Sequence, residues 1–287
     1  MVLSNDQAEA VRLAVSNEPI VAIQAALGID KMVAGAIIAA LFSSRPPSTV
    51  VVTATLMRRL PNLQRLYLDD FAHLEVVRYL SDTAASDNLY PTGVDLTVVL
   101  KSLGDRYEAQ LGAAEREFCR GFKEKRELLE RCLEDPTMFL YMSEEGQNEY
   151  GIAERSVSQP IEKMVMLMFR VQRPAILCLT AGSLLNSTDL ANGLFRRYSS
   201  SFGAIIGDEA SQVPGPALAA IASRIPEAKQ CYIRDIHQLE PHARCQRTST
   251  SHFWRSQRHE CPSGSRSRAG VSSGYNLQGA PRSKCAP

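Results

Sequence analysis

The sequence lacks the features that would place the protein in a membrane or outside the cell. Its longest apolar run, residues 33–42, has ten residues, about half of what a bilayer crossing needs. Its first residues, MVLSNDQAEAVRL, have no cationic start followed by an apolar core, so no targeting signal is visible. Its seven cysteines are odd in number and irregularly spaced, which favours reduced thiols over a disulfide framework. We therefore expect an intracellular protein, cytoplasmic or nuclear, with no membrane span and no disulfides.

The sequence also lacks a large net charge, but its charges are unevenly distributed. The formal net charge is +1, yet residues 243–287 contain eight lysines or arginines and one acid, a net of +7 that leaves −6 for residues 1–242. Residues 243–287 also contain too few large apolar side chains to offset the entropy lost on ordering. We expect a mildly acidic folded body followed by a disordered basic tail.

Short runs of β-branched and apolar residues alternate with turns and helical stretches, which predicts an α/β fold with a parallel sheet. Runs such as VVVTA and AIIG are apolar on both faces, as in strands that are buried between two layers of helices. The expected strands are 20–24, 49–54, 75–79, 176–180, 204–207 and 231–233.

Between the third and fourth expected strands, apolar side chains recur at three- and four-residue steps. This spacing predicts one long amphipathic helix, with a second helical region after Pro160 that packs against it as an antiparallel insertion. The methionine-rich face MVMLMF of the second region indicates core packing, with a partner groove as the alternative. The first stripe consists of Leu96, Leu100, Leu103, Tyr107, Leu111, Ala114, Phe118 and Phe122, and the second of Ile161, Met164, Val165, Met168 and Phe169.

Two segments carry residues suited to phosphate chemistry. The segment AALGIDKM, residues 25–32, follows a strand and keeps the lysine of the phosphate-loop pattern G-x-x-x-x-G-K-[ST] as Lys31. The apolar strand FGAIIG ends in Asp208 and Glu209, an arrangement that can place one carboxylate on Mg²⁺ and another on the attacking water. The alternatives are a solvated lysine and an acidic cap on the following helix. A later strand leads to Gln238, a neutral polar group suited to sensing a phosphate.

The order of several motifs resembles that of superfamily 1 helicases, in the branch that contains the nonsense-mediated-decay helicase and its nematode relatives. The resemblance covers residues 1–242 and depends on the succession of motifs more than on any one of them. These motifs are LSNDQAEAV, the segment with Lys31, PSTVVVTAT, EVVRYLSD, ILCLTAGSLL, GDEASQ and RDIHQLEP.

The resemblance implies a RecA-like motor domain that binds ATP, Mg²⁺ and single-stranded RNA or DNA. Gln7 would hydrogen-bond the adenine edge, Lys31 would meet the β and γ phosphates, and Gly28 and Asp235 would belong to the same nucleotide site. Asp208 would hold Mg²⁺, Glu209 would orient or deprotonate water, and Gln238 would report the γ phosphate. Thr53 and Thr55 would lie against the nucleic-acid backbone.

The sequence departs from the family pattern at the phosphate loop. Ala25 and Asp30 replace its two glycines, which places side chains where backbone amides should approach phosphate, and Met32 removes the hydroxyl that would bind Mg²⁺. We expect weakened nucleotide binding and impaired hydrolysis. The pattern also stops near Cys245, so the resemblance implies a chain truncated after the first motor domain.

The expected organisation is a RecA-like domain in two parts, 1–93 and 171–242, a helical insertion at 94–170, and the tail at 243–287. The alternative function is a non-catalytic RNA- or protein-binding module derived from a helicase, and a product without selected function is a third possibility. In the tail, Phe253 and Trp254 could support weak nucleic-acid binding among the arginines, against an inert solvated tail. A zinc site made by Cys245, His252, His259 and Cys261 is disfavoured, because their spacing matches no common zinc pattern.

Overall fold

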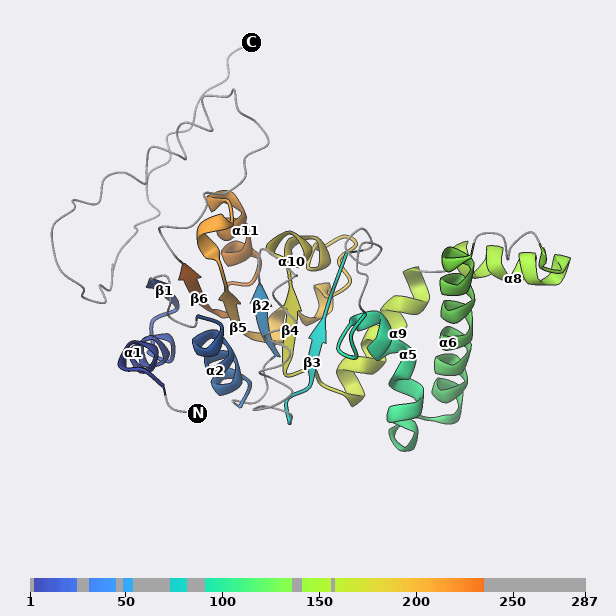
Figure 1. The fold of residues 1–287 in the computed structure, drawn as a ribbon, viewed down its shortest axis with the longest axis horizontal. Helices are drawn as coiled ribbons and strands as arrows, with labels where there is room; N and C mark the ends of the chain where they lie inside the picture. Colours follow the sequence, from blue (N-terminus) through green and yellow to red (C-terminus); the bar gives the residue numbers. More distant parts are fainter. Residues whose placement is uncertain are drawn as a thin grey trace, which may run out of the picture.

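The computed structural model has a six-stranded sheet in which every neighbouring pair of strands is parallel, with helices on both faces (Figure 1). The strand order is β1-β6-β5-β2-β4-β3. This confirms the predicted α/β class, a parallel sheet of the RecA-like type between helices. The structure describes residues 3–24, 31–44, 49–53, 73–81, 91–135, 141–155 and 158–234.

The six predicted strands are all present, each with ends within two residues of the prediction. Strands β2 and β4 are buried along their whole length, as their apolar sequences predict for strands between two helical layers. The strands are β1 (Ile20–Gln24), β2 (Thr49–Thr53), β3 (Val76–Arg78), β4 (Ile176–Leu179), β5 (Phe202–Gly207) and β6 (Lys229–Arg234).

Alternate strand residues supply two separate cores, one on each face of the sheet. On one face Val50 and Val52 pack with helices α1 (Asn5–Ala14) and α2 (Lys31–Ser43). On the other face Val51 packs in a larger core that contains Cys119 of a later helix and side chains of four helices next to the sheet. Those helices are α5 (Leu96–Arg106), α9 (Ser158–Val171), α10 (Ala181–Ser187) and α11 (Gly215–Arg224).

The prediction of one long helix through residue 122 is wrong, because the chain breaks into α5, the 3₁₀ turn η2 (Glu108–Gln110) and α6 (Ala113–Glu134). Leu111 is buried in extended backbone between the turn and α6. Gly112 then caps α6, and its N–H donates to the Glu115 carboxylate at 3.0 Å. Both helices bury apolar residues in the same core, so the two series of apolar residues look continuous in the sequence.

The predicted insertion contains two different kinds of helix. Helices α5 and α9 share the larger core with the sheet, and the buried Met164, Val165 and Met168 confirm that the methionine-rich face is core. Helices α6 and α8 (Glu144–Arg155) lie farther out, at the end of the molecule away from β1 (Figure 1). We call α6 and α8 the helical arm, and the sheet with its covering helices the body.

The arm is attached to the body by apolar packing and by charged side chains. Cys119 of α6 is 2% exposed within the larger core, and Phe118 and Phe122 pack against that core. Towards α9, Arg170 forms two hydrogen bonds of 2.8 and 2.7 Å to Glu115, and the Lys163 ammonium lies 4.0 Å from the Phe118 ring centroid. Towards α5, the ion pairs are Lys123–Asp105 at 2.8 Å and Lys101–Glu130 at 2.6 Å.

A buried ion pair lies inside the body, where β3 meets α5. Arg78 binds Asp95 through two N–H groups, one of them at 2.8 Å, and both side chains are about 5% exposed. Thr92 adds a backbone donor and a hydroxyl donor to the same carboxylate, at 2.9 and 3.1 Å. The carboxylate is thus held by three groups and fixes the start of α5 on the edge strand.

The cysteines of the described residues are free thiols. Burial raises the pKa of Cys178 and of Cys231 to about 12, so both are protonated at neutral pH. Helices long and apolar enough to span a membrane are absent from the described part of the chain. The predicted tail, 243–287, lies outside the described residues.

Candidate functional site

The topology brings the ends of four strands to one edge of the sheet. In the order β1-β6-β5-β2 all strands run parallel, so the segments that follow them leave from the same edge. The register places Thr53 beside Gly207, Gly207 beside Tyr232, and Tyr232 beside Ala22. The last residues of β1, β2, β5 and β6, far apart in the sequence, therefore lie along the same edge. In open α/β sheets this carboxyl edge is where ligands bind.

Asp208 lies immediately after β5 and is hydrogen-bonded to β2. Its N–H donates to the Thr53 carbonyl at 2.8 Å, which extends the β2–β5 ladder by one bond and brings two predicted site residues together. The Thr53 side chain itself is only 3% exposed, so it faces the protein interior. Thr55, the other predicted nucleic-acid residue, lies outside the described residues.

Glu209 has a left-handed backbone conformation, with φ 54° and ψ 36°, and is 8% exposed. A non-glycine residue in this region stores strain on the order of 1–2 kcal/mol, and such residues concentrate at functional sites. Its N–H donates to Asp208 Oδ1 at 2.9 Å, its Oε2 accepts from Gln212 Nε2 at 3.1 Å, and its carbonyl accepts from Gln212 N at 2.8 Å. The turn thus places the two carboxylates next to each other at the strand end.

The alternative, that these acids cap the next helix, applies only to a short 3₁₀ turn, whose N-cap residue is Glu209 without a side-chain capping bond. The 3₁₀ turn η4 (Ala210–Gln212) separates Glu209 from α11, and the N-cap residue of α11 is Pro214. Gln212, which holds the Glu209 carboxylate, was not among the predicted site residues. The only feature of the sequence that could have pointed to Gln212 is its position three residues after Glu209. A 3₁₀ turn brings residues at this spacing together.

Position 207, the last residue of β5, requires glycine because a neighbouring side chain lies too close for a Cβ atom. A Cβ atom at this position would lie 2.6 Å from Cδ1 of Tyr232 on the neighbouring strand, so a side chain would displace the ring. The Tyr232 hydroxyl hydrogen-bonds Gln230 Oε1, and burial raises the pKa of Tyr232 to about 12. This packing sets the distance between β5 and β6 directly before Asp208.

Lys31 is the first residue of α2, which begins after the segment that follows β1. Gln7 lies on α1, where its side-chain oxygen accepts from Ser4 N at 2.9 Å while Ser4 Oγ accepts from Gln7 N at 3.2 Å. This capping box stabilises the start of α1 and engages the side chain of Gln7, the residue expected to hydrogen-bond adenine. Gly28, Asp235 and Gln238 lie outside the described residues, but their segments leave from paired strands, since Gln24 pairs with Arg234.

A metal cluster made by protein groups alone is absent from the described ranges, where no three His, Cys, Asp or Glu side chains gather. Mg²⁺ in nucleotide sites takes one or two carboxylates and fills its shell with phosphate oxygens and water. Asp208 offers the hard oxygen ligand that such an ion needs. The tail residues considered for zinc lie outside the described residues.

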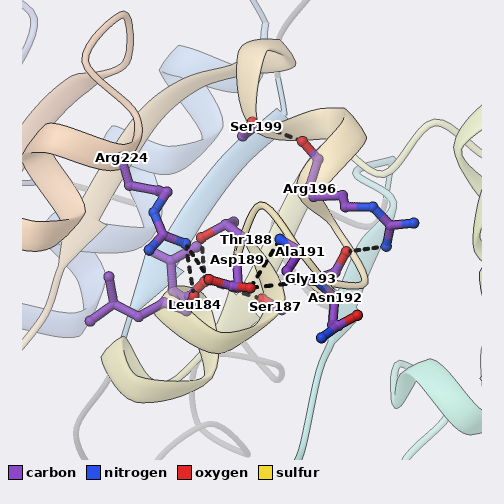
Figure 2. A network of polar contacts seen from close by, with 11 residues as sticks. Leu184, Ser187, Thr188, Asp189, Ala191, Asn192, Gly193, Arg196, Ser199 and Arg224 are labelled. Atoms are coloured by element: carbon purple, nitrogen blue, oxygen red, sulfur yellow. Dashed lines mark hydrogen bonds and ion pairs between the residues drawn. The ribbon is translucent and has the colours of Figure 1, made fainter.

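A second polar cluster, which the sequence did not predict, joins α10 to α11 (Figure 2). Asp189 Oδ2 accepts from the N–H groups of Ala191 and Asn192 at 3.1 and 3.4 Å, and its Oδ1 lies 3.8 Å from Arg224 of α11. A Cβ on Gly193 would lie 2.4 Å from the Asp189 nitrogen, so the turn closes tightly. The cluster is fully used in folding the turn after α10, and it fixes the helix that follows the acidic pair.

No protein-family model matches the chain, and a search of the curated proteins found no match. The resemblance to superfamily 1 helicases therefore remains a prediction from the order of the motifs.

Proposed function

We propose that the protein is an ATP- and Mg²⁺-binding domain of the superfamily 1 helicase type that acts on single-stranded nucleic acid. One observation carries the proposal: the segment before Lys31, the pair Asp208 and Glu209, and the segment after Arg234 all leave the sheet at one edge, from three adjacent strands. A phosphate loop, a metal-binding acid and a phosphate sensor need this proximity to reach one nucleotide.

The chemistry of the described residues fits the proposed ligand. The N-terminus of α2, where Lys31 begins the helix, carries a partial positive charge that favours phosphate. Asp208 would hold Mg²⁺, which neutralises charge on the phosphates when the nucleotide is bound. Glu209 would orient water, and its bond from Gln212 fixes the carboxylate that must do so.

Nucleotide binding is expected to be weak, because the phosphate loop carries Ala25, Asp30 and Met32. Each lost charge-assisted bond to phosphate or metal is worth on the order of 1.5–3 kcal/mol, or roughly ten- to a hundredfold in affinity. We expect a Kd for Mg·ATP in the high micromolar to millimolar range.

Titration of the full chain with a fluorescent ATP analogue and Mg²⁺ tests the proposal. Lys31→Ala and Asp208→Asn should each weaken binding at least about tenfold. Lys125→Ala, on the exposed face of α6, is the matched control and should leave the Kd unchanged. The double variant Asp30→Gly with Met32→Thr should tighten binding, and adding Ala25→Gly should tighten it further.

Two results would contradict the assignment: tight binding that ignores Lys31→Ala, or an affinity that does not respond to the repaired loop. The alternative, a non-catalytic RNA- or protein-binding module, predicts a different pattern. In that case a single-stranded oligonucleotide or a protein would bind equally well with and without nucleotide, and Asp208→Asn would change neither affinity.

A further inference from the structure

Among the residues that the structure describes, helices cover the edge strand β1 on one face only. Val21 and Ile23 pack in the core beneath α1 and α2, whereas Ile20, Ala22 and Gln24 on the opposite face are exposed, Ile20 to 58%. The central strands are buried on both faces. The helical layer formed by α5, α9, α10 and α11 therefore stops short of β1 in the described part of the chain.

Tyr232 forms the border of this uncovered region. It lies opposite Ala22 in the parallel register and packs its ring over Gly207, so one side of the region is a half-buried aromatic ring. We call Ile20, Ala22, Gln24 and Tyr232 the open face. Ile20 and Ala22 are apolar, Gln24 carries an amide at one end, and Tyr232 carries a phenol beside Ala22.

We propose that Phe253 and Trp254 of the same chain cover the open face. The last described residue, Arg234, pairs with Gln24, so the remaining chain leaves the sheet next to this face. Trp254 lies 20 residues beyond Arg234, which at about 3.3 Å per residue gives a reach near 65 Å. The strand to be covered has five residues and is about 17 Å long, so the connection is amply sufficient.

Among residues 243–287, Phe253 and Trp254 are the best suited to cover an apolar face. In 243–287 they are the only adjacent pair of large apolar side chains, while Val271 and Leu277 stand alone among small and polar residues. Aromatic side chains cover much apolar area with few rotatable bonds, and an indole N–H can donate to an amide such as that of Gln24. A strand from a second copy would pair with the edge of β1 but leave the side chains of the open face in water.

The proposal is independent of nucleotide binding and has a built-in reporter, because Trp254 is the only tryptophan. In the full chain its emission should be blue-shifted, and its quenching by acrylamide several-fold weaker, relative to the same chain in guanidinium chloride. Ile20→Lys and Phe253→Ser should both shift the emission to the red and increase quenching. Leu190→Lys, on a loop position that is 80% exposed, is the control and should change neither.

Phe253→Ser keeps the test decisive if Ile20→Lys fails to fold, because it alters no described residue. The proposal is overturned if Trp254 is quenched as strongly in the native chain as in denaturant, or if neither variant affects it. Shielding that disappears on dilution would instead assign the face to a second copy. Shielding that appears only when a single-stranded oligonucleotide is added would assign Trp254 to nucleic-acid binding.

Discussion

The body and the helical arm differ in how far they depend on exposed ion pairs. Within the body, apolar side chains on both faces of the sheet are buried and the Arg78–Asp95 ion pair is buried with them, whereas the Arg224–Asp189 pair lies nearer the surface. The arm packs Cys119 into the larger core and adds the ion pairs Arg170–Glu115 and Lys123–Asp105, whose side chains are 29–71% exposed. Changes in salt and pH have little effect on buried apolar packing, whereas they weaken exposed ion pairs. The stability of the body should therefore change little with salt and pH, and the attachment of the arm should change more.

The largest effect should come from charging the larger core. Leu103 on α5 is 1% exposed, and Leu103→Asp would bury a carboxylate without a partner, at a cost of at least about 4 kcal/mol in the free energy of unfolding. Arg106→Asp, three residues on and 53% exposed, should cost less than about 1 kcal/mol. Urea unfolding of both variants measures the difference, and equal losses would mean that α5 does not belong to the body.

The second effect concerns the buried ion pair. Asp95→Asn should cost about 3–5 kcal/mol, because it leaves the Arg78 guanidinium buried without a counter-charge. Glu115→Gln, which removes the carboxylate of an exposed pair in the arm, should cost far less. Thermal unfolding of the two variants compares the same chemical change in two environments, and similar losses would remove the distinction between body and arm.

The third effect is a pH dependence of the arm. Hydrogen bonds from Arg170 and from the Gly112 N–H lower the pKa of Glu115 from 4.5 to about 2. A folded-state pKa below the unfolded value gives stabilisation that is complete above about pH 4.5 and lost as the pH falls towards 2. Hydrogen exchange in α6, corrected for intrinsic rates, should rise over this window before exchange in the strands does. The variant Glu115→Gln should remove that early rise.

The smallest effect should come from salt. Raising the ionic strength from about 0.1 to 1 M shortens the Debye length from about 10 to 3 Å and weakens exposed ion pairs. Exchange of α6 amides should increase slightly while that of β2 and β4 stays constant. An equal response in strands and arm would show that the exposed ion pairs do not hold α6.

The strands of the body could be predicted because each is a short apolar run bounded by turns, a pattern that local sequence displays fully. The break before α6 was missed because Leu111 continues the apolar spacing, although Gly112 followed by Glu115 is a recognisable capping pattern. The pairing of Arg78 with Asp95 joins residues 17 apart across two elements, and neither residue signals burial by itself.

For the candidate site, the acidic pair and its strand could be predicted, but the strand order could not. Placing β6 between β1 and β5 depends on long-range packing, and this is what brings the segments around Lys31 and Asp208 to one edge. The left-handed backbone of Glu209 and its bond to Gln212 depend on a turn geometry that residue types alone do not specify. For Gln7 the residue type misleads. A glutamine could hydrogen-bond adenine, but at this position, three residues after Ser4, it forms a capping box.

The pairing of β1 with β6 has a consequence for synthesis of the chain. Ile20 pairs with Gln230, about 210 residues later, so β1 has no strand partner until nearly all of the described chain has left the ribosome. At the usual 5–20 residues per second this delay is on the order of 10–40 s. Throughout it, β1 and the apolar α2 must remain unaggregated, which makes the nascent N-terminal segment a natural client for chaperones.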